Sequence, residues 1–259
     1  MRSTDAASVP PSIRPRADAR LRLRLDDGDA TTVHVARWDL RGTRVRIERL
    51  AAQEPVVEWC SGNGCQDALV GGFYTRPEGH PLGELRLRGR AIRHVPFSSP
   101  WNTTRASLHV ADGAVSIARR DALPLDARGD LLQAGPLLVA GGRVVYHDGV
   151  DSEGFSSGAD QFDSDITAAR HPRAALGIGE HELIAAVADG RSPRDAGVSL
   201  GELAQLMLRL GADAAMNLDG GGSASLVCDG QLRNRPREQH GIRLDRGRAV
   251  TTVIAFDAA

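Results

Sequence analysis

Apolar and polar residues alternate along much of the first 120 residues, which is the pattern of strands that bury one face. The alternation surrounds an Asp-Asp-Gly-Asp turn at 26–29, which predicts a hairpin over residues 20–40. Further alternating segments cover 44–50, 83–92 and 106–120. A short apolar run at 67–76 is interrupted by Gly71-Gly72, so we expect a strand followed by a tight turn or bulge.

In the second half, apolar residues come in continuous runs, which are typical of strands covered on both faces. Residues 131–149 predict a buried strand, a Gly-Gly turn and a second strand. Residues 173–191 predict two strands around a turn, and the second of them, 183–188, is apolar throughout, so we expect it at the centre of a sheet. Later strands are expected at 214–218, 224–234 (with an Asp-Gly turn) and 249–256.

One segment has a clear helical period. Ser199 and Glu202 form the spacing of a capping box, and Gly211 suits a left-handed stop. Between them, apolar residues recur every three or four positions on one face: Leu200, Leu203, Leu206, Met207 and Leu210.

These elements predict an α+β fold: a sheet-rich single domain with a mixed central sheet and few helices. We expect residues 1–18 to be a disordered leader and residues 19–259 to be the domain. The leader lacks the apolar core of a signal peptide, which predicts a cytoplasmic location. No apolar run approaches the roughly 20 residues that a membrane span needs.

The net charge and the type of basic residue exclude several kinds of ligand and catalytic site. The formal net charge is −1, which argues against a nucleic-acid partner. All 32 basic residues are arginine. Without lysine there is no Walker-A phosphate loop and no Schiff-base site, so an anion must be held by arginine, backbone amides or helix ends.

Metal and cofactor sites are not expected. Cys60 and Cys65 lie close enough in sequence for a small disulfide loop, but two reduced thiols fit a cytoplasmic protein better, and with Cys228 they do not make a four-ligand zinc set. The polar segment 151–172 is predicted to be a long loop. Its aspartates lack the spacing of a calcium loop, so solvated carboxylates are the better interpretation of Asp160, Asp163 and Asp165.

The most informative stretch is Asn-Leu-Asp-Gly-Gly-Gly-Ser at 217–223. A structural turn is the ordinary interpretation of such glycines. The residues that follow are β-like, which excludes a helix-opening dinucleotide fingerprint, and the spacing is wrong for a nucleophile elbow. What remains is a strand end that projects Asn217 and Asp219, followed by amides able to bind an oxyanion. A ligand with a sugar at Asp219 and a phosphate at the amides would satisfy both groups.

Together with other motifs, this stretch resembles the phosphodiester glycosidase family. The resemblance is carried by Val-Gly-Gly-Phe-Tyr at 70–74, Gln-Ala-Gly-Pro-Leu-Leu-Val-Ala-Gly-Gly-Arg-Val at 133–144, Arg-Ala-Ala-Leu-Gly-Ile-Gly at 173–179, and Ala-Asp-Gly-Arg at 188–191. It covers roughly residues 65 to 256. Two positions depart from the family's pattern: Val70 replaces an asparagine and Ala174 replaces a threonine.

The resemblance implies a hydrolase that cleaves between a sugar's anomeric carbon and a phosphodiester, without a cofactor. The predicted catalytic residues are Asp219 and Asp189, at strand ends that one sheet could bring together, and Arg173, whose guanidinium suits a phosphate. The predicted substrate-binding residues are Gly71, Gly72, Phe73, Arg191, Asn217, Gly220, Gly221, Gly222 and Ser223. Weaker candidates for contacting the sugar are Arg76, His80, Trp101, Phe155 and Phe162.

Three of these residues could instead have a purely structural role. Asp189 could form an Asp-Gly turn, Arg173 could pair at the surface, and Asn217 could cap a strand end. The substrate would be a small or glycan-linked sugar phosphodiester. Two other functions stay open: a phosphosugar-binding module without activity, and a phosphodiesterase that cleaves the P–O bond. The sequence does not indicate the oligomeric state or which aspartate has which role.

Overall fold

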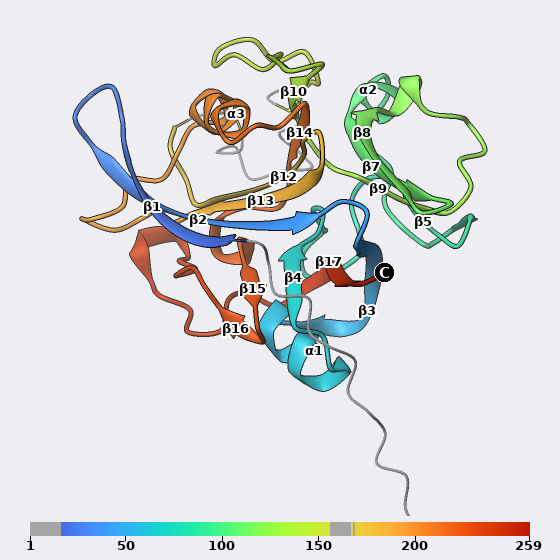
Figure 1. The fold of residues 1–259 in the computed structure, drawn as a ribbon, viewed down its shortest axis with the longest axis horizontal. Coiled ribbons are helices and arrows are strands. Elements are labelled where there is room, and N and C mark those ends of the chain that lie inside the picture. The colour runs from blue at the N-terminus through green and yellow to red at the C-terminus, as the bar shows by residue number, and fades with distance from the viewer. Residues whose placement is uncertain (1–16, 156–166, 168) are drawn as a thin grey trace, which may run out of the picture.

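The computed structural model describes residues 17–155, 167 and 169–259, and its strands form three sheets (Figure 1). The largest sheet has seven strands, in the order β1 (Ala17–Arg24), β2 (Ala30–Asp39), β13 (Glu182–Ala188), β12 (Arg173–Ile178), β14 (Ala214–Asn217), β10 (Leu137–Ala140) and β11 (Arg143–Val144). A five-stranded sheet contains β16 (Gln231–Leu232), β15 (Leu226–Cys228), β4 (Asp67–Val70), β17 (Val250–Ala258) and β3 (Thr43–Glu54). The third sheet contains β6 (Arg90–Ala91), β5 (Leu85–Leu87), β9 (Asp130–Gln133), β7 (Ala106–Ala111) and β8 (Ala114–Arg119).

Helices are few in the described part of the chain: α1 (Val56–Asn63), α2 (Trp101–Thr104) and α3 (Leu200–Arg209), with single 3-10 turns at η1 (Arg120–Ala122), η2 (Gly221–Ser223) and η3 (Gln239–Gly241). The helix α3 begins with the predicted capping box: the Ser199 hydroxyl accepts from the Glu202 amide, and the Glu202 carboxylate accepts from the Ser199 amide. None of the helices described is long and apolar enough to cross a membrane.

The seven-stranded sheet is covered on both faces. The helix α3 packs on one face, and the sheet that contains β17 lies on the other (Figure 1). Alternate residues of β13 therefore pack on opposite faces. Ile184, Ala186 and Ala188 pack in the core under α3, and Leu183, Ala185 and Val187 pack in a second core between the two sheets. In that second core the rings of Trp38 and Phe256 stack with centroids 4.0 Å apart. The prediction of a central, doubly buried strand at 183–188 is confirmed.

The α+β, sheet-rich fold class is confirmed, but the prediction of a mixed central sheet is wrong. Every strand pair among the described residues is antiparallel. The helix α3 does connect two strands that run the same way, β13 and β14. These strands are not neighbours, however, because β12 lies between them and pairs antiparallel with both.

Two predicted boundaries also change. Residues 17 and 18 belong to β1 and pair with Arg37 and Ala36, so the predicted leader over residues 1–18 is two residues too long at its end; residues 1–16 lie outside the described part. The apolar segment 131–140 forms two strands in different sheets, β9 and β10, because the chain turns at Gly135-Pro136. The Gly-Pro pair is a turn signal within the apolar segment, but both strands are buried and the pattern does not indicate that they join different sheets.

Candidate active site

The Asp-Gly-Gly-Gly-Ser segment lies where the seven-stranded sheet meets the five-stranded sheet that contains β4. The strand β14 ends at Asn217, and the next amide, that of Leu218, donates to the Ala174 carbonyl on β12 at 2.9 Å. The Asp219 amide then donates to the Gly71 carbonyl, which directly follows β4 of the other sheet, at 3.1 Å. The backbone of Asp219 is therefore fixed to both sheets at once.

Close contacts and one positive φ angle favour glycine in the turn that follows. Gly221 has a positive φ of 59°, which glycine adopts without strain. A Cβ on Gly222 would lie 2.8 Å from the Glu238 carboxylate. Most amides of this turn already donate within the protein: Gly220 to Asp219 Oδ1, Gly221 to the Pro172 carbonyl, and Ser223 to the Gly220 carbonyl. Among the described residues, the Gly222 amide has no acceptor, so at most one of the three predicted amides is left for an anion.

The side chain of Asp219 is surrounded by donors. The Ser223 hydroxyl hydrogen-bonds to it, and Arg248 and Arg76 contribute positive charge. Burial raises the pKa of Asp219 to about 6, although the Ser223 hydrogen bond and the Arg248 charge act in the opposite direction. The neighbouring Tyr74 also has a raised pKa, because of burial and the negative charge of Asp219.

Arg248 stands two residues before β17 and reaches across this cluster. Its Nε donates to Glu238 Oε1 at 2.6 Å, and its Nη2 donates to Glu238 Oε2. Its Nη1 lies 3.5 Å from the Ser223 hydroxyl. The hydrogen bonds from Arg248 hold the pKa of Glu238 below its usual value. Asp219, Ser223, Tyr74, Glu238 and Arg248 are called the Asp219 cluster below.

The structure places Arg191 at the edge of this cluster. Its Nη1 lies 3.1 Å from the point that a Cβ on Gly221 would occupy, and it donates to the Arg237 carbonyl at 3.3 Å. Its positive charge also helps to lower the pKa of Glu238, after the larger contribution of Arg248. Of the predicted substrate-binding residues, Ser223, Gly220–Gly222 and Arg191 thus lie beside Asp219.

Asp189, the second predicted catalytic carboxylate, has different neighbours. It follows β13, two strands from Asp219 across β12, which separates the two backbones by roughly 10 Å. Only 3% of Asp189 is exposed. One carboxylate oxygen lies 3.2 Å from His34 Nε2, and the other accepts from the Arg235 amide at 2.7 Å. These contacts tie β2, β13 and the segment after β16 together.

Arg173 and Asn217 also have partners within the fold. The Arg173 backbone lies beside the Gly-rich turn, but its Nε donates to the Val198 carbonyl at 3.2 Å, on the side of the sheet that α3 covers. Its positive charge lowers the pKa of Tyr146 against the larger effect of burial. The Asn217 amide group donates to the Gly135 and Leu218 carbonyls, so the interpretation of Asn217 as a strand-end cap describes its contacts.

The predicted binding residues Gly71, Gly72 and Phe73 make contacts within the fold. The Gly71 and Gly72 amides donate to the Thr252 carbonyl and hydroxyl, and a Cβ on Gly71 would lie 2.4 Å from that hydroxyl. Phe73 is 6% exposed and packs edge-to-face on Phe97 and Phe155. These residues shape the second core, because backbone approach and ring packing already use their polar groups and surfaces.

Of the weaker candidates for contacting the sugar, some lie near Asp219 and others pack within the fold. Arg76 is exposed and acts on Asp219 through its charge. Phe155 is buried in the aromatic cluster, and Trp101 packs against the backbone of Gly154. His80 is half-buried, and its amide donates to the Thr75 hydroxyl at 3.3 Å. Phe162 and the loop aspartates Asp160, Asp163 and Asp165 lie outside the described residues. Cys60, Cys65 and Cys228 are buried free thiols.

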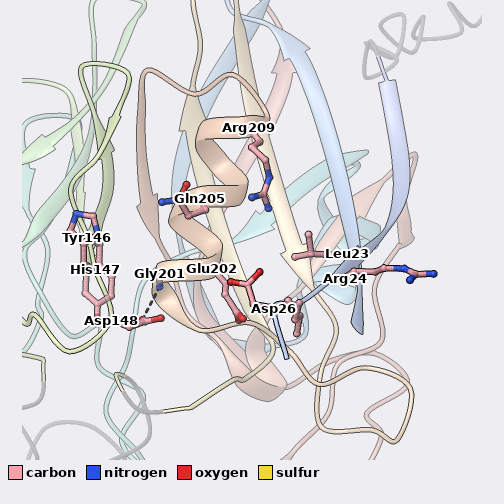
Figure 2. A pocket seen from close by; sticks show the side chains of 11 residues that line it. Leu23, Arg24, Asp26, Tyr146, His147, Asp148, Gly201, Glu202, Gln205 and Arg209 are labelled. Carbon is pink, nitrogen blue, oxygen red and sulfur yellow. Dashed lines mark hydrogen bonds between the residues drawn. The ribbon is translucent and has the colours of Figure 1, made fainter. Parts of the chain in front are cut away.

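A separate cavity of about 280 Å³ lies beside α3. Figure 2 shows Glu202, Gln205 and Arg209 along α3, with Asp148 hydrogen-bonded to the Gly201 amide at 2.9 Å. None of the residues predicted from the sequence to form the site lines this cavity. It is therefore distinct from the Asp219 cluster.

Sequence reasoning missed three members of the cluster. Tyr74 is the last residue of the Val-Gly-Gly-Phe-Tyr motif and directly follows the predicted Phe73. Arg248 directly precedes a predicted strand, and a charged residue at a strand end was the available signal. Glu238 had no signal, because it lies in an arginine-rich irregular segment whose path only tertiary contacts determine.

The chain is similar in sequence to a known protein family and to a mouse enzyme. The phosphodiester glycosidase family profile matches residues 63–256. The mouse N-acetylglucosamine-1-phosphodiester alpha-N-acetylglucosaminidase is 28% identical over 204 residues, which are 74% of this chain. The matched region spans only 37% of the mouse enzyme.

Solved structures share the fold. The catalytic domain of the zebrafish N-acetylglucosamine-1-phosphodiester alpha-N-acetylglucosaminidase, auto-inhibited by its pro-peptide, superposes with a TM-score of 0.68 at 19% identity, covering 94% of this chain and 83% of that one. A hypothetical protein from Synechocystis gives 0.62 at 19% identity, covering 93% and 62%. A putative exported protein from Burkholderia pseudomallei gives 0.63 at 18% identity, covering 88% and 74%.

Proposed function

The chain belongs to the phosphodiester glycosidase family, and on that premise we propose that it hydrolyses the bond between a sugar's anomeric carbon and a phosphodiester oxygen at the Asp219 cluster. The observation that carries this proposal is a partly buried carboxylate with a raised pKa, placed beside an arginine guanidinium and a Gly-rich turn. A sugar phosphodiester needs this combination, because its reacting carbon becomes electron-poor while its phosphate carries negative charge.

Each group has a role in the proposed reaction. Ionised Asp219 stabilises the positive charge that develops on the sugar ring as the C–O bond breaks. Arg248 and the Gly222 amide hold the phosphate, and Arg191 and Arg76 add positive charge at the edge. Water supplies its oxygen to the anomeric carbon and a proton to the medium. The leaving group is a phosphate monoester whose second pKa is about 6, so its departure needs no strong general acid.

The proposed role of Asp219 predicts the pH dependence. Asp219 must be ionised to stabilise positive charge, and its pKa is raised to about 6. We therefore expect kcat/KM to fall below pH 6, by about tenfold for each further pH unit. The measurement is a pH profile of kcat/KM with a substrate whose own charge does not change between pH 5 and 8. A profile that falls above pH 6 instead would assign Asp219 the role of an acid and contradict the proposal.

Hydrolysis in oxygen-18 water distinguishes glycosidase action from cleavage of the P–O bond. We expect the label in the sugar hydroxyl, as determined by mass spectrometry of the products, because water attacks the anomeric carbon. Label in the phosphate would support a phosphodiesterase. Absence of turnover across a panel of sugar 1-phosphodiesters, with binding retained, would support the non-catalytic alternative.

A further inference from the structure

Two carboxylates belong to the Asp219 cluster, and Glu238 is the one that no sequence motif indicated. Both of its oxygens accept from Arg248, through Nε at 2.6 Å and through Nη2. This is the two-bond fork that a guanidinium forms with a carboxylate. The side chains of Glu238 and Arg248 are 28% and 21% exposed, so the pair is largely shielded from water.

The local backbone is arranged to bring Glu238 to this position. The Glu238 amide donates to the Ile242 carbonyl at 2.8 Å, which closes the η3 turn. The Arg248 amide donates to the Gly222 carbonyl at 2.9 Å. Any side chain at position 222 would displace the Glu238 carboxylate, because a Cβ there would lie 2.8 Å from Oε1. Gly222 therefore permits the approach of Glu238 to Arg248.

The fork uses one edge of the guanidinium and leaves the other directed into the cluster. The Nε–Nη2 edge is occupied by Glu238, whereas Nη1 lies 3.5 Å from the Ser223 hydroxyl, which itself hydrogen-bonds to Asp219. An arginine has many rotamers, and holding it in one of them costs conformational free energy. A carboxylate that holds Nε in place before substrate arrives reduces the cost that binding would otherwise incur.

We propose that Glu238 is a positioning residue for the substrate: it fixes the Arg248 guanidinium so that the Nη1 edge faces the phosphate of a sugar phosphodiester bound at Asp219. The inference rests on the proposed function, because it takes that phosphate as the group that Arg248 binds. Glu238 itself touches no reacting atom. Its contribution is to substrate affinity, and it differs in this from Asp219, whose contribution is to the chemical step.

The test compares Glu238→Ala and Glu238→Gln with the parent. Glu238→Ala removes both acceptors, so KM for a sugar 1-phosphodiester should rise about tenfold, and kcat should change by less than about threefold. Glu238→Gln keeps one oxygen for Nε and should restore most of the affinity. Inorganic phosphate binding, measured by calorimetry, should weaken in the same order, and this readout does not require turnover.

Glu84 provides a matched control. It forms a similar fork with Arg120, with Nε to Oε2 at 2.5 Å and Nη2 to Oε1 at 3.4 Å. The two residues flank β5 and β8, in a sheet that contributes no residue to the Asp219 cluster. Glu84→Ala should lower thermal stability comparably without changing KM or phosphate affinity.

The inference is wrong if Glu238→Ala retains the parent's KM and phosphate affinity, or if it lowers kcat alone. If the parent hydrolyses no sugar phosphodiester, the proposed function fails. In that case the order of phosphate affinities still decides whether Glu238 positions Arg248 for an anion.

Discussion

Asp219→Asn should lower kcat for sugar 1-phosphodiester hydrolysis by about a thousandfold, with little change in substrate affinity. Asparagine has the same shape, and its oxygen can still accept from the Gly220 amide, which now donates to Asp219 Oδ1 at 2.9 Å. The substitution therefore removes the negative charge while leaving the turn intact. Steady-state kinetics would measure the effect, and thermal unfolding would establish that the variant is folded.

Asp189→Asn is the matched control for this result. Asp189 is held by His34 and the Arg235 amide, and its neighbours are structural, so the variant should lose stability and keep most of its kcat. A folded Asp189→Asn protein without activity would instead support the catalytic role predicted from the sequence. If Asp219→Asn retained full activity, the proposed site would be wrong.

Arg248→Gln should reduce kcat/KM by about a hundredfold, because it removes a charged donor from the phosphate that leaves. It should also displace the acid limb of the pH profile. The charge of Arg248 lowers the pKa of Asp219 against the larger effect of burial, so its removal should raise that pKa further above 6 and move the limb to higher pH. The measurement is kcat/KM between pH 5 and 8 for both proteins.

Arg248→Lys separates charge from geometry. Lysine keeps the positive charge, so the acid limb should stay near pH 6, but it lacks the planar fork that Glu238 holds, so affinity should still fall. Arg120→Gln, which breaks the comparable pair with Glu84, should leave both the limb and kcat/KM unchanged. An unshifted limb in Arg248→Gln would contradict the placement of Arg248 beside Asp219.

Much of the fold could be predicted because local patterns specify it. The alternation at 20–40 gave the β1–β2 hairpin, and the spacing of Ser199 and Glu202 gave the start of α3. The division of 131–140 was missed although Gly135-Pro136 is a turn signal, and the local pattern does not show that the two apolar strands join different sheets. The helix α1 was missed because only Val56, Trp59 and Cys60 of its eight residues are buried, which leaves a weak helical period.

The candidate site was predicted less completely than the fold. Asp219, Ser223 and the glycines carry a motif in consecutive positions, and the structure keeps them together. Asp189 and Arg173 were joined to them by the argument that strand ends meet at one edge of a sheet. That argument locates backbones. It does not locate side chains, and those of Asp189 and Arg173 turn to His34 and to the Val198 carbonyl.

The sequence by itself determined the class of fold, because local periodicity specifies most of the strands and the helix α3. It also determined the family and the carboxylate at the centre of the proposed site, because runs of adjacent residues form the motifs that indicate them. Only the tertiary structure decided which charges surround Asp219. Arg248 and Glu238 come from irregular segments 29 and 19 residues away along the chain. Their contact depends on Gly222, the η3 turn and the meeting of two sheets. Long-range packing sets that geometry, and no short-range pattern encodes it.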